Sequence, residues 1–180
     1  MKTTTAILAL AALAGSASAS ITYIGSFGGK DYYRNDTLLS YTNARSVAEN
    51  LFAGQSYLLA INSAAEQAWL NSTIGHITNS GPVFWLGLNK AGNPGGGQAA
   101  LNTWDSGEAV TYTNWIGNAT FNDPNRNYAS WNWNNGGGWD LLSDTGSPFG
   151  LKRSIIEVPA PGALSLIGLA GLAAARRRRA

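Results

Sequence analysis

The sequence predicts an α+β fold, in which two helices are preceded and followed by short strands. Patterns with helical periodicity are confined to the region between residues 42 and 75. On both sides of it, short β-rich segments alternate with Gly, Asn and Pro, which is typical of strands and turns. Strands followed by helices and then by strands indicate the α+β class rather than alternating β-α units.

The first two strands are expected at Ile21–Phe27 and Lys30–Arg34, with Gly28 and Gly29 between them. The first helix is expected over Thr42–Phe52. Its apolar residues recur at i, i+3, i+4 and i+7 and therefore share one face: Ala44, Val47, Ala48 and Leu51.

Ser63 is expected to cap the second helix, because Glu66 follows three residues later and completes a capping box. Gly75 is expected to end this helix. Its apolar face is expected to carry Ala64 or Ala65 together with Ala68, Trp69 and Ile74. Four later strands are expected, at Val83–Leu88, Thr111–Trp115, Asn127–Trp133 and Lys152–Val158.

The charge of the chain is divided unevenly between its ends and its middle. Of the 12 basic residues, five lie in the terminal segments, whereas all 10 acidic residues lie between Asp31 and Glu157. The middle therefore carries seven basic against ten acidic residues, a net charge of −3. A basic surface that binds nucleic-acid phosphates is not expected. The chain has no Cys and a single His, which excludes disulfides, thiolate chemistry and multi-His metal sites.

The N-terminal segment, residues 1–19, has the pattern of a secretory signal peptide. Lys2 precedes an apolar run, Ala6–Ala14, and Ala17-Ser18-Ala19 has the small residues of a cleavage site. The apolar run is too short for a permanent transmembrane helix. We therefore expect an exported protein, and the absence of Cys is compatible with bacterial export.

The C-terminal segment, residues 159–180, is expected to lie outside the domain. Pro159 and Pro161 should stop the last strand, and a short apolar run follows over Ala163–Ala175. The segment then ends in a basic cluster, Arg176, Arg177, Arg178 and Arg179. Together with the motif Val158, Pro159, Ala160 and Pro161, these features resemble the PEP-CTERM sorting signal, with Ala160 in place of its Glu.

The sorting-signal resemblance implies a precursor anchored in the inner membrane by a short transmembrane helix at about Ala163–Arg177. An exosortase-type processing enzyme would then act on the tail, and the protein would reach the cell surface or the extracellular space. The arginines would stay on the cytoplasmic side by the positive-inside rule. An ordinary C-terminal anchor is the alternative.

Residues 20–158 suffice for one domain with one core, and six segments within them carry motifs in order. These are Thr42–Ser63, Phe84–Asn89 (FWLGLN), Thr103–Trp115, Asp123–Asn125 (DPN), Gly138–Asp140 (GWD) and Ser154–Glu157. The set resembles the C-type lectin-like domain family over about Tyr23–Val158. The resemblance implies that the first and last strands pair, so that Tyr23 lies near Ile155. It also implies flanking helices and a functional loop over about Lys90–Asn127. Family members often carry a Cys pair where Ala48 and Ile156 stand, so these two residues are expected to touch.

The resemblance also implies ligand-binding residues on that loop: Asp123, Asn125, Asp140, Trp115 and Trp139. In the family, carboxylates and amides at the first three positions hold calcium, to which a sugar binds. Here Arg126 places a positive charge beside the site, and Leu141 replaces a further oxygen ligand. Because Ca²⁺ binds six to eight oxygens, we expect weak calcium binding at Asp123, Asn125 and Asp140, or none.

No residue pattern predicts catalysis. His76 is alone at a helix end, without a nucleophile or an orienting group. Two classes of binding function remain. The first is an exported module that recognises carbohydrate, such as an exopolysaccharide or a cell-surface glycan. The second is an adhesion or structural envelope module that binds protein without sugar or calcium. A fold alone does not distinguish them.

Overall fold

The computed structural model describes residues 21–74, 82–133, 137–147 and 149–159. The expected signal segment, His76 and the tail from Ala160 onward, with its helix at Ala163–Arg177, lie outside these residues. Within the described ranges, no helix is long and apolar enough to cross a membrane.

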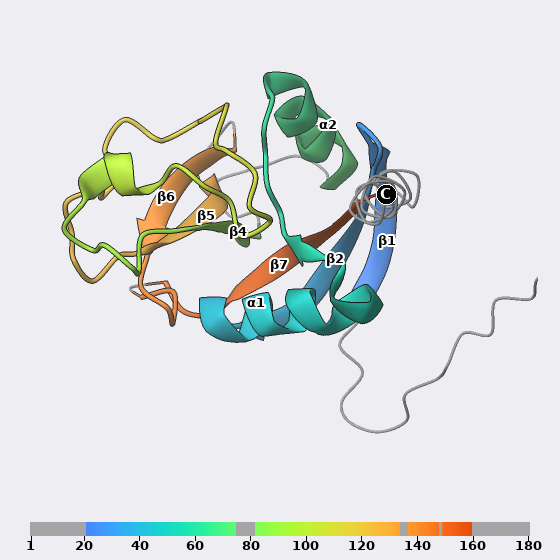
Figure 1. The fold of residues 1–180 in the computed structure, drawn as a ribbon, viewed down its shortest axis with the longest axis horizontal. Helices are drawn as coiled ribbons and strands as arrows, with labels where there is room; N and C mark the ends of the chain where they lie inside the picture. The colour runs from blue at the N-terminus through green and yellow to red at the C-terminus, as the bar shows by residue number, and fades with distance from the viewer. Residues whose placement is uncertain (1–20, 75–81, 134–136, 148, 160–180) are drawn as a thin grey trace, which may run out of the picture.

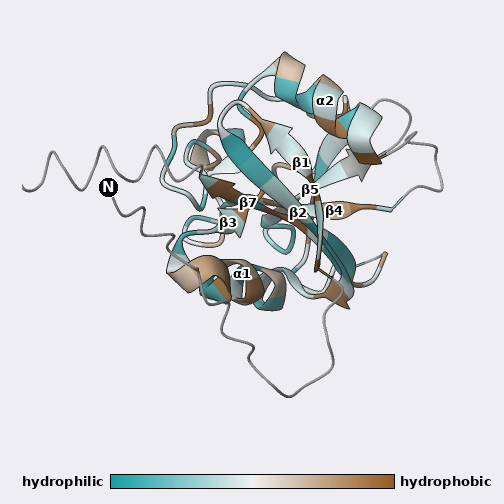
Figure 2. Cartoon of the chain, turned by 90° about the vertical axis from the view of Figure 1, so that its right-hand side faces the viewer, coloured by the Kyte–Doolittle hydropathy of each residue, from teal (hydrophilic) through white to brown (hydrophobic). Residues whose placement is uncertain are grey.

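Seven strands of the described chain form one sheet, with helices on opposite sides (Figures 1 and 2). The strand order is β1-β2-β7-β4-β5-β6, and β3 also pairs with β7. The strands are β1 (Ile21–Phe27), β2 (Lys30–Leu39), β3 (Tyr57–Leu58), β4 (Phe84–Asn89), β5 (Tyr128–Trp133), β6 (Gly138–Leu142) and β7 (Lys152–Pro159). Strands β4 and β7 run parallel, and the other pairs are antiparallel.

The closure of the domain differs from the expected pairing of the first and last strands. β7 pairs with β2, so that Ile155 lies opposite Arg34 and Ile156 opposite Tyr33. Tyr23 in β1 lies opposite Tyr33, which places β2 between Tyr23 and Ile155. The expected direct pairing was wrong because the N-terminal hairpin joins the sheet through its second strand. β7 also includes Pro159, one residue more than predicted.

Helix α1 (Tyr41–Asn50) follows its apolar periodicity. Ser40 caps it by accepting a hydrogen bond from the backbone N–H of Asn43, at 3.3 Å. The predicted face is confirmed: Ala44 and Ala48 are fully buried, and Val47 and Leu51 pack beside them. Ala48 and Ile156 belong to the same buried cluster, as expected from the Cys pair of the family. Its members are Tyr41, Ala44, Ala48, Leu58, Trp85, Leu142 and Ile156.

Helix α2 (Ala64–Ile74) begins as predicted but buries only part of the predicted face. Ser63 Oγ accepts a hydrogen bond from Glu66 N at 3.1 Å, which confirms the cap. The Glu66 carboxylate, however, accepts the N–H of Asn62 and the hydroxyl of Tyr32. The buried side chains are Glu66, Gln67 and Leu70, whereas the predicted Ala64, Ala65 and Ala68 are exposed. The predicted Trp69 and Ile74 are partly buried and pack against the core, as expected. The prediction failed for the alanines because this helix also buries polar groups that have hydrogen-bond partners.

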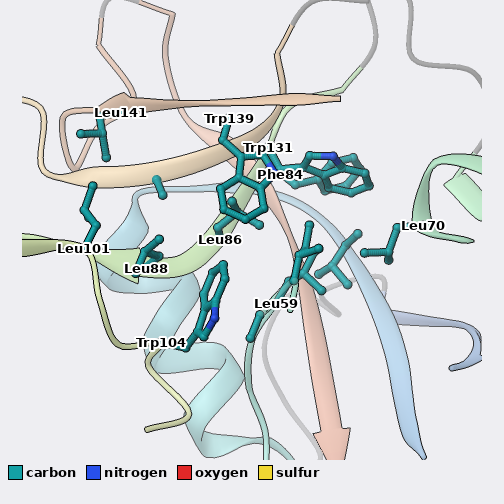
Figure 3. Packing of buried hydrophobic residues seen from close by; sticks show 14 of the residues in the cluster. Leu59, Leu70, Phe84, Leu86, Leu88, Leu101, Trp104, Trp131, Trp139 and Leu141 are labelled. Atoms are coloured by element: carbon teal, nitrogen blue, oxygen red, sulfur yellow. The ribbon is translucent and has the colours of Figure 1, made fainter. Parts of the chain in front are cut away.

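The larger core cluster lies between the sheet, α2 and the long connection after β4 (Figure 3). Trp131 and Trp139 are fully buried in it, and Trp104 retains only 2% exposure. Each such ring removes about 150–250 Å² from water. The core therefore depends heavily on aromatic rings, which supply apolar area in a chain without disulfides.

Residues 90–127 connect β4 to β5 as a long loop with little regular structure. It contains a 3₁₀ turn at Gly97–Ala100 and isolated bridges from Thr103 to Ala109 and from Trp115 to Trp139. The predicted strand at Thr111–Trp115 is absent from this described segment, because Trp115 forms only that single bridge. Strand β6, which sequence analysis did not predict, supplies the partner for the bridge.

Candidate functional site on the long loop

The interior of the loop is held by a buried carboxylate that contacts α1 and β4. Asp105 Oδ2 accepts the Tyr41 hydroxyl at 2.6 Å, and Asp105 Oδ1 accepts Asn89 Nδ2 at 3.2 Å. Arg45 Nε lies 3.6 Å from the same carboxylate, whose side chain is only 5% exposed. Burial raises the pKa of Asp105. The hydrogen bonds from Tyr41 and Asn89 and the charge of Arg45 oppose this shift, because they stabilise the ionised carboxylate. Asp105 thus fixes a point within the loop to α1 and β4.

A second polar network joins the loop to the sheet and α2. Asn62 Oδ1 accepts Trp104 Nε1 at 2.7 Å, and Asn62 Nδ2 donates to Glu108 Oε2 at 2.6 Å. Lys30 Nζ donates to Glu108 Oε2 at 3.2 Å and to Glu157 Oε1 at 3.1 Å. Burial raises the pKa of Glu157 to about 7, although the Lys30 ammonium opposes this shift.

Asp123 and Asn125, predicted as ligands, lie in a turn whose polar groups bind one another. Asp123 Oδ1 accepts the backbone N–H of Asn125 at 2.8 Å. Asp123 Oδ2 lies 3.3 Å from Arg126 Nε. Beneath the turn, the nearly buried Lys90 donates from Nζ to the carbonyl oxygens of Asp123, at 3.0 Å, and Pro94, at 2.8 Å. Burial lowers the pKa of Lys90, while Asp123 opposes that shift.

Asp140, the third predicted ligand, is buried on β6 with 4% exposure. Its Oδ1 accepts three hydrogen bonds, from Thr120 N at 3.1 Å, Thr120 Oγ1 at 3.3 Å and Leu141 N at 2.7 Å. The carboxylate therefore ties the loop to the sheet. Within the described residues, His, Asp and Glu form no group of three or more that could hold a metal ion. Calcium binds six to eight oxygens, and Oδ1 of Asp140 and both carboxylate oxygens of Asp123 already have partners within the protein.

The two predicted tryptophans contact each other, with ring centroids 5.4 Å apart. Trp139 is fully buried, and its Nε1 donates to Gln67 Oε1 at 2.9 Å. It therefore packs in the core and offers no ring face to a ligand. Trp115 is partly buried against Phe121, with centroids 5.0 Å apart. Its Nε1 is buried without a hydrogen-bond partner among the described residues.

An open pocket of about 400 Å³ lies on the loop beside Lys90. Its lining combines amide side chains with small residues: Asn89, Lys90, Gly92, Asn93, Gly96, Ala99, Ala100 and Asn102. At Gly96, an added Cβ would lie 2.5 Å from Asn93 Nδ2 and 2.8 Å from Ala100 Cβ, so the wall tolerates little more than hydrogen there. Sequence analysis missed this site, although the Asn- and Gly-rich composition of residues 89–102 was its signal.

Comparisons with known proteins agree with this fold. The CEL-I lectin of Cucumaria echinata is 26% identical, with a TM-score of 0.60 over 74% of this chain and 92% of that one. Herring type II antifreeze protein shares the fold at 17% identity, with a TM-score of 0.57 over 74% of this chain and 94% of that one.

A curated relative, the 30 kDa spicule matrix protein of Hemicentrotus pulcherrimus, is 36% identical over 74 residues, or 39% of this chain. The aligned part spans only 24% of that protein. The family model of the Lectin C-type domain matches residues 37–146, more than half of the chain. The chain therefore belongs to the C-type lectin domain family.

Proposed function

We propose that this chain is an exported surface or matrix binding module that recognises carbohydrate through its long loop, without a calcium ion. The pocket lined by Asn89, Asn93 and Asn102 carries the proposal. Proteins of this fold are typically binding modules without enzymatic activity.

The chemistry of the pocket suits a neutral sugar. Asn side chains carry both donors and an acceptor, which are the partners that hydroxyl groups need. The Asn89 amide already donates to Tyr41 and Asp105 and accepts the N–H of Ala91, so Asn93 and Asn102 are the amides that supply these groups to a ligand. Ala99 and Ala100 provide small apolar surfaces between the amides, and binding pockets commonly combine apolar walls with a few placed polar groups. Asn89 is held by Tyr41 and Asp105, so its amide is pre-oriented before a ligand arrives.

We leave calcium out of the proposed mechanism because Asp123 and Asp140 already have partners within the protein. Arg126 is paired with the first carboxylate, and Thr120 binds the second. A cation would have to displace both interactions before it could offer coordination sites to a sugar. We therefore place recognition in direct hydrogen bonds from the loop.

Export and surface attachment are proposed from the two terminal segments. Residues 1–19 would direct secretion, and the Val158–Pro161 motif with Arg176–Arg179 would direct transient anchoring and exosortase-type processing. A protein-binding or structural role in a matrix is the second candidate, supported by the similarity to a spicule matrix protein.

A glycan array with and without a calcium chelator tests the proposal. We expect binding that the chelator leaves unchanged and that Ala99→Phe abolishes, because the new ring fills the pocket. The matched control is Gln98→Phe, which adds the same ring to an exposed neighbour outside the pocket lining. Calcium-dependent binding, or equal loss in both variants, would contradict the site. Retention of no glycan under either condition would favour the protein-binding candidate.

A further inference from the structure

Three aromatic side chains form a row across the N-terminal hairpin, on elements other than the long loop. The ring centroids of Tyr23 and Tyr33 are 5.4 Å apart, and those of Tyr33 and Phe52 are 4.7 Å apart. Tyr33 packs partly against the core, whereas Tyr23 is 54% and Phe52 43% exposed. We call these three residues the hairpin aromatic row. Both of its ends present ring surface to solvent.

The hairpin register places polar groups beside this row. Tyr23 pairs with Tyr33 and Ser26 with Asp31, and an irregularity between Tyr23 and Gly25 keeps both pairs on one face. The hydroxyls of Tyr23 and Ser26 are 2.6 Å apart, and Ser26 Oγ donates to Asp31 Oδ1. Hydroxyl and carboxylate groups that can exchange hydrogen bonds with a ligand therefore border the rings.

Phe52 is held in a conformation that its side chain disfavours. It has φ 46°, and the next residue, Ala53, has φ 59°. Residues with a Cβ are disfavoured in the left-handed region, because the Cβ approaches the following carbonyl oxygen. Such strain persists where the surrounding structure enforces it, and it clusters at ligand-binding and other functional sites. Here the strained backbone places the Phe52 ring against Tyr33 and leaves much of the Phe52 ring exposed.

We propose that the hairpin aromatic row is a second carbohydrate site, which binds an extended chain of neutral pyranose units independently of the long-loop pocket. Pyranose rings present apolar C–H faces that pack on aromatic rings, while their hydroxyls reach polar groups at the rim. A row of rings suits consecutive sugars of a chain better than a single sugar. β1 is at the edge of the described sheet, so a chain can extend past Tyr23.

The negative charge near the hairpin aromatic row favours a neutral polysaccharide over an acidic one. Asp31 borders the row, and residues 20–158 carry seven basic against ten acidic side chains. An acidic polysaccharide would meet like charge there. A protein partner fits the row poorly, because stable interfaces engage about 20–30 residues on each side.

Isothermal titration calorimetry with β-1,4-linked glucose and mannose hexasaccharides, on the full-length chain, tests this site. Phe52→Gly removes the ring and relieves the backbone strain, so a loss of binding is not a loss of folding. Tyr23→Ala removes the ring at the other end. We expect each change to weaken binding of at least one hexasaccharide by about two- to tenfold, and glucose or mannose alone to bind far more weakly.

The controls separate this site from the long-loop site. Leu38→Ala removes an exposed apolar side chain, 52% accessible, from the same hairpin and should leave binding unchanged. In an Ala99→Phe background, where the loop pocket is filled, Phe52→Gly and Tyr23→Ala should still weaken the remaining hexasaccharide binding by the same factor. Hexasaccharide binding that is lost in Ala99→Phe but kept in Phe52→Gly and Tyr23→Ala overturns the hairpin site while supporting the loop site. The absence of binding heat for both hexasaccharides with folded protein also overturns it.

Discussion

Arg126 Nε lies 3.3 Å from Asp123 Oδ2, so the carboxylate that the family motif offers to a cation is paired with a side chain of its own turn. Both side chains are partly exposed, and the pair itself adds little to stability. Its consequence for ligands is larger, because a positive charge at about 4 Å opposes a divalent calcium ion by on the order of 2–8 kcal/mol.

Replacing Arg126 is expected to strengthen calcium binding. In Arg126→Gln, removal of the guanidinium should increase the affinity by about tenfold or more, as measured by calorimetric titration. Arg153→Gln is the control, because its guanidinium pairs with Asp36 on the sheet. In the unmodified protein, micromolar Ca²⁺ should give no one-site isotherm. A clear isotherm that disappears in the Asp123→Ala, Asp140→Ala double variant would contradict this.

Glu157 is expected to make the domain less stable as pH rises from about 5 to 8. Burial raises the pKa of this carboxyl from 4.5 to about 7 in the folded protein. Between these values the folded state therefore holds a proton that the unfolded state has released, so the free energy of unfolding falls with rising pH. The shift corresponds to a loss on the order of 3 kcal/mol. The raised pKa of Lys30 does not alter this window, because Lys30 remains protonated in both states below its ordinary value of 10.5.

Urea denaturation of Glu157→Gln at pH 5 and pH 8 measures this effect. The variant should lose most of the decrease in stability that the unmodified protein shows between the two values. Glu49→Gln, on the outer part of α1, removes one carboxylate from a partly exposed position and is the matched control. An identical pH profile in Glu157→Gln and the unmodified protein would show that Glu157 does not titrate in this range.

The success of sequence analysis depended on whether burial followed apolar periodicity. In α1 it did, because Ala44 and Ala48 face the sheet and have no polar atoms to satisfy. In α2 it did not. Glu66 and Gln67 are buried because Tyr32 and Trp139 bind them, and these partners come from strands far away in the sequence.

The same distinction between local sequence pattern and tertiary contacts explains which parts of the candidate site could be predicted. The position of Asp123 beside Arg126 follows from their adjacency in the chain, and it was anticipated. The three hydrogen bonds that occupy Asp140 depend on the path of the loop at Thr120, which no local pattern specifies. The pocket, by contrast, is lined by a single segment, residues 89–102, whose Asn- and Gly-rich composition was a local signal, but the path that shapes its walls was not predicted.

Gly87→Ala is expected to destabilise the domain. An added Cβ would lie 2.6 Å from the carbonyl oxygen of Leu58, which is backbone of β3 and has little freedom to move. Overpacking of this kind typically costs about 1–3 kcal/mol, so thermal denaturation should show a lower midpoint. Gly117→Ala is the control, because nothing lies within 4 Å of its added Cβ. Equal midpoints in the two variants would mean that β3 and β4 can separate at little cost.

Removal of residues 160–180 is expected to leave the domain stable while releasing it from membranes. Among the described residues, the two buried clusters run from Tyr32 to Ile156. The truncation should begin at Ala160, because Pro159 pairs with Lys30 at the end of β7. The melting temperature should stay nearly unchanged, and the protein should move from the membrane to the soluble fraction in cell fractionation. A truncation beginning at Ser154 is the control for lost strand pairing, and it should abolish cooperative unfolding. A large fall in melting temperature on removing only residues 160–180 would instead show that the tail packs on the fold.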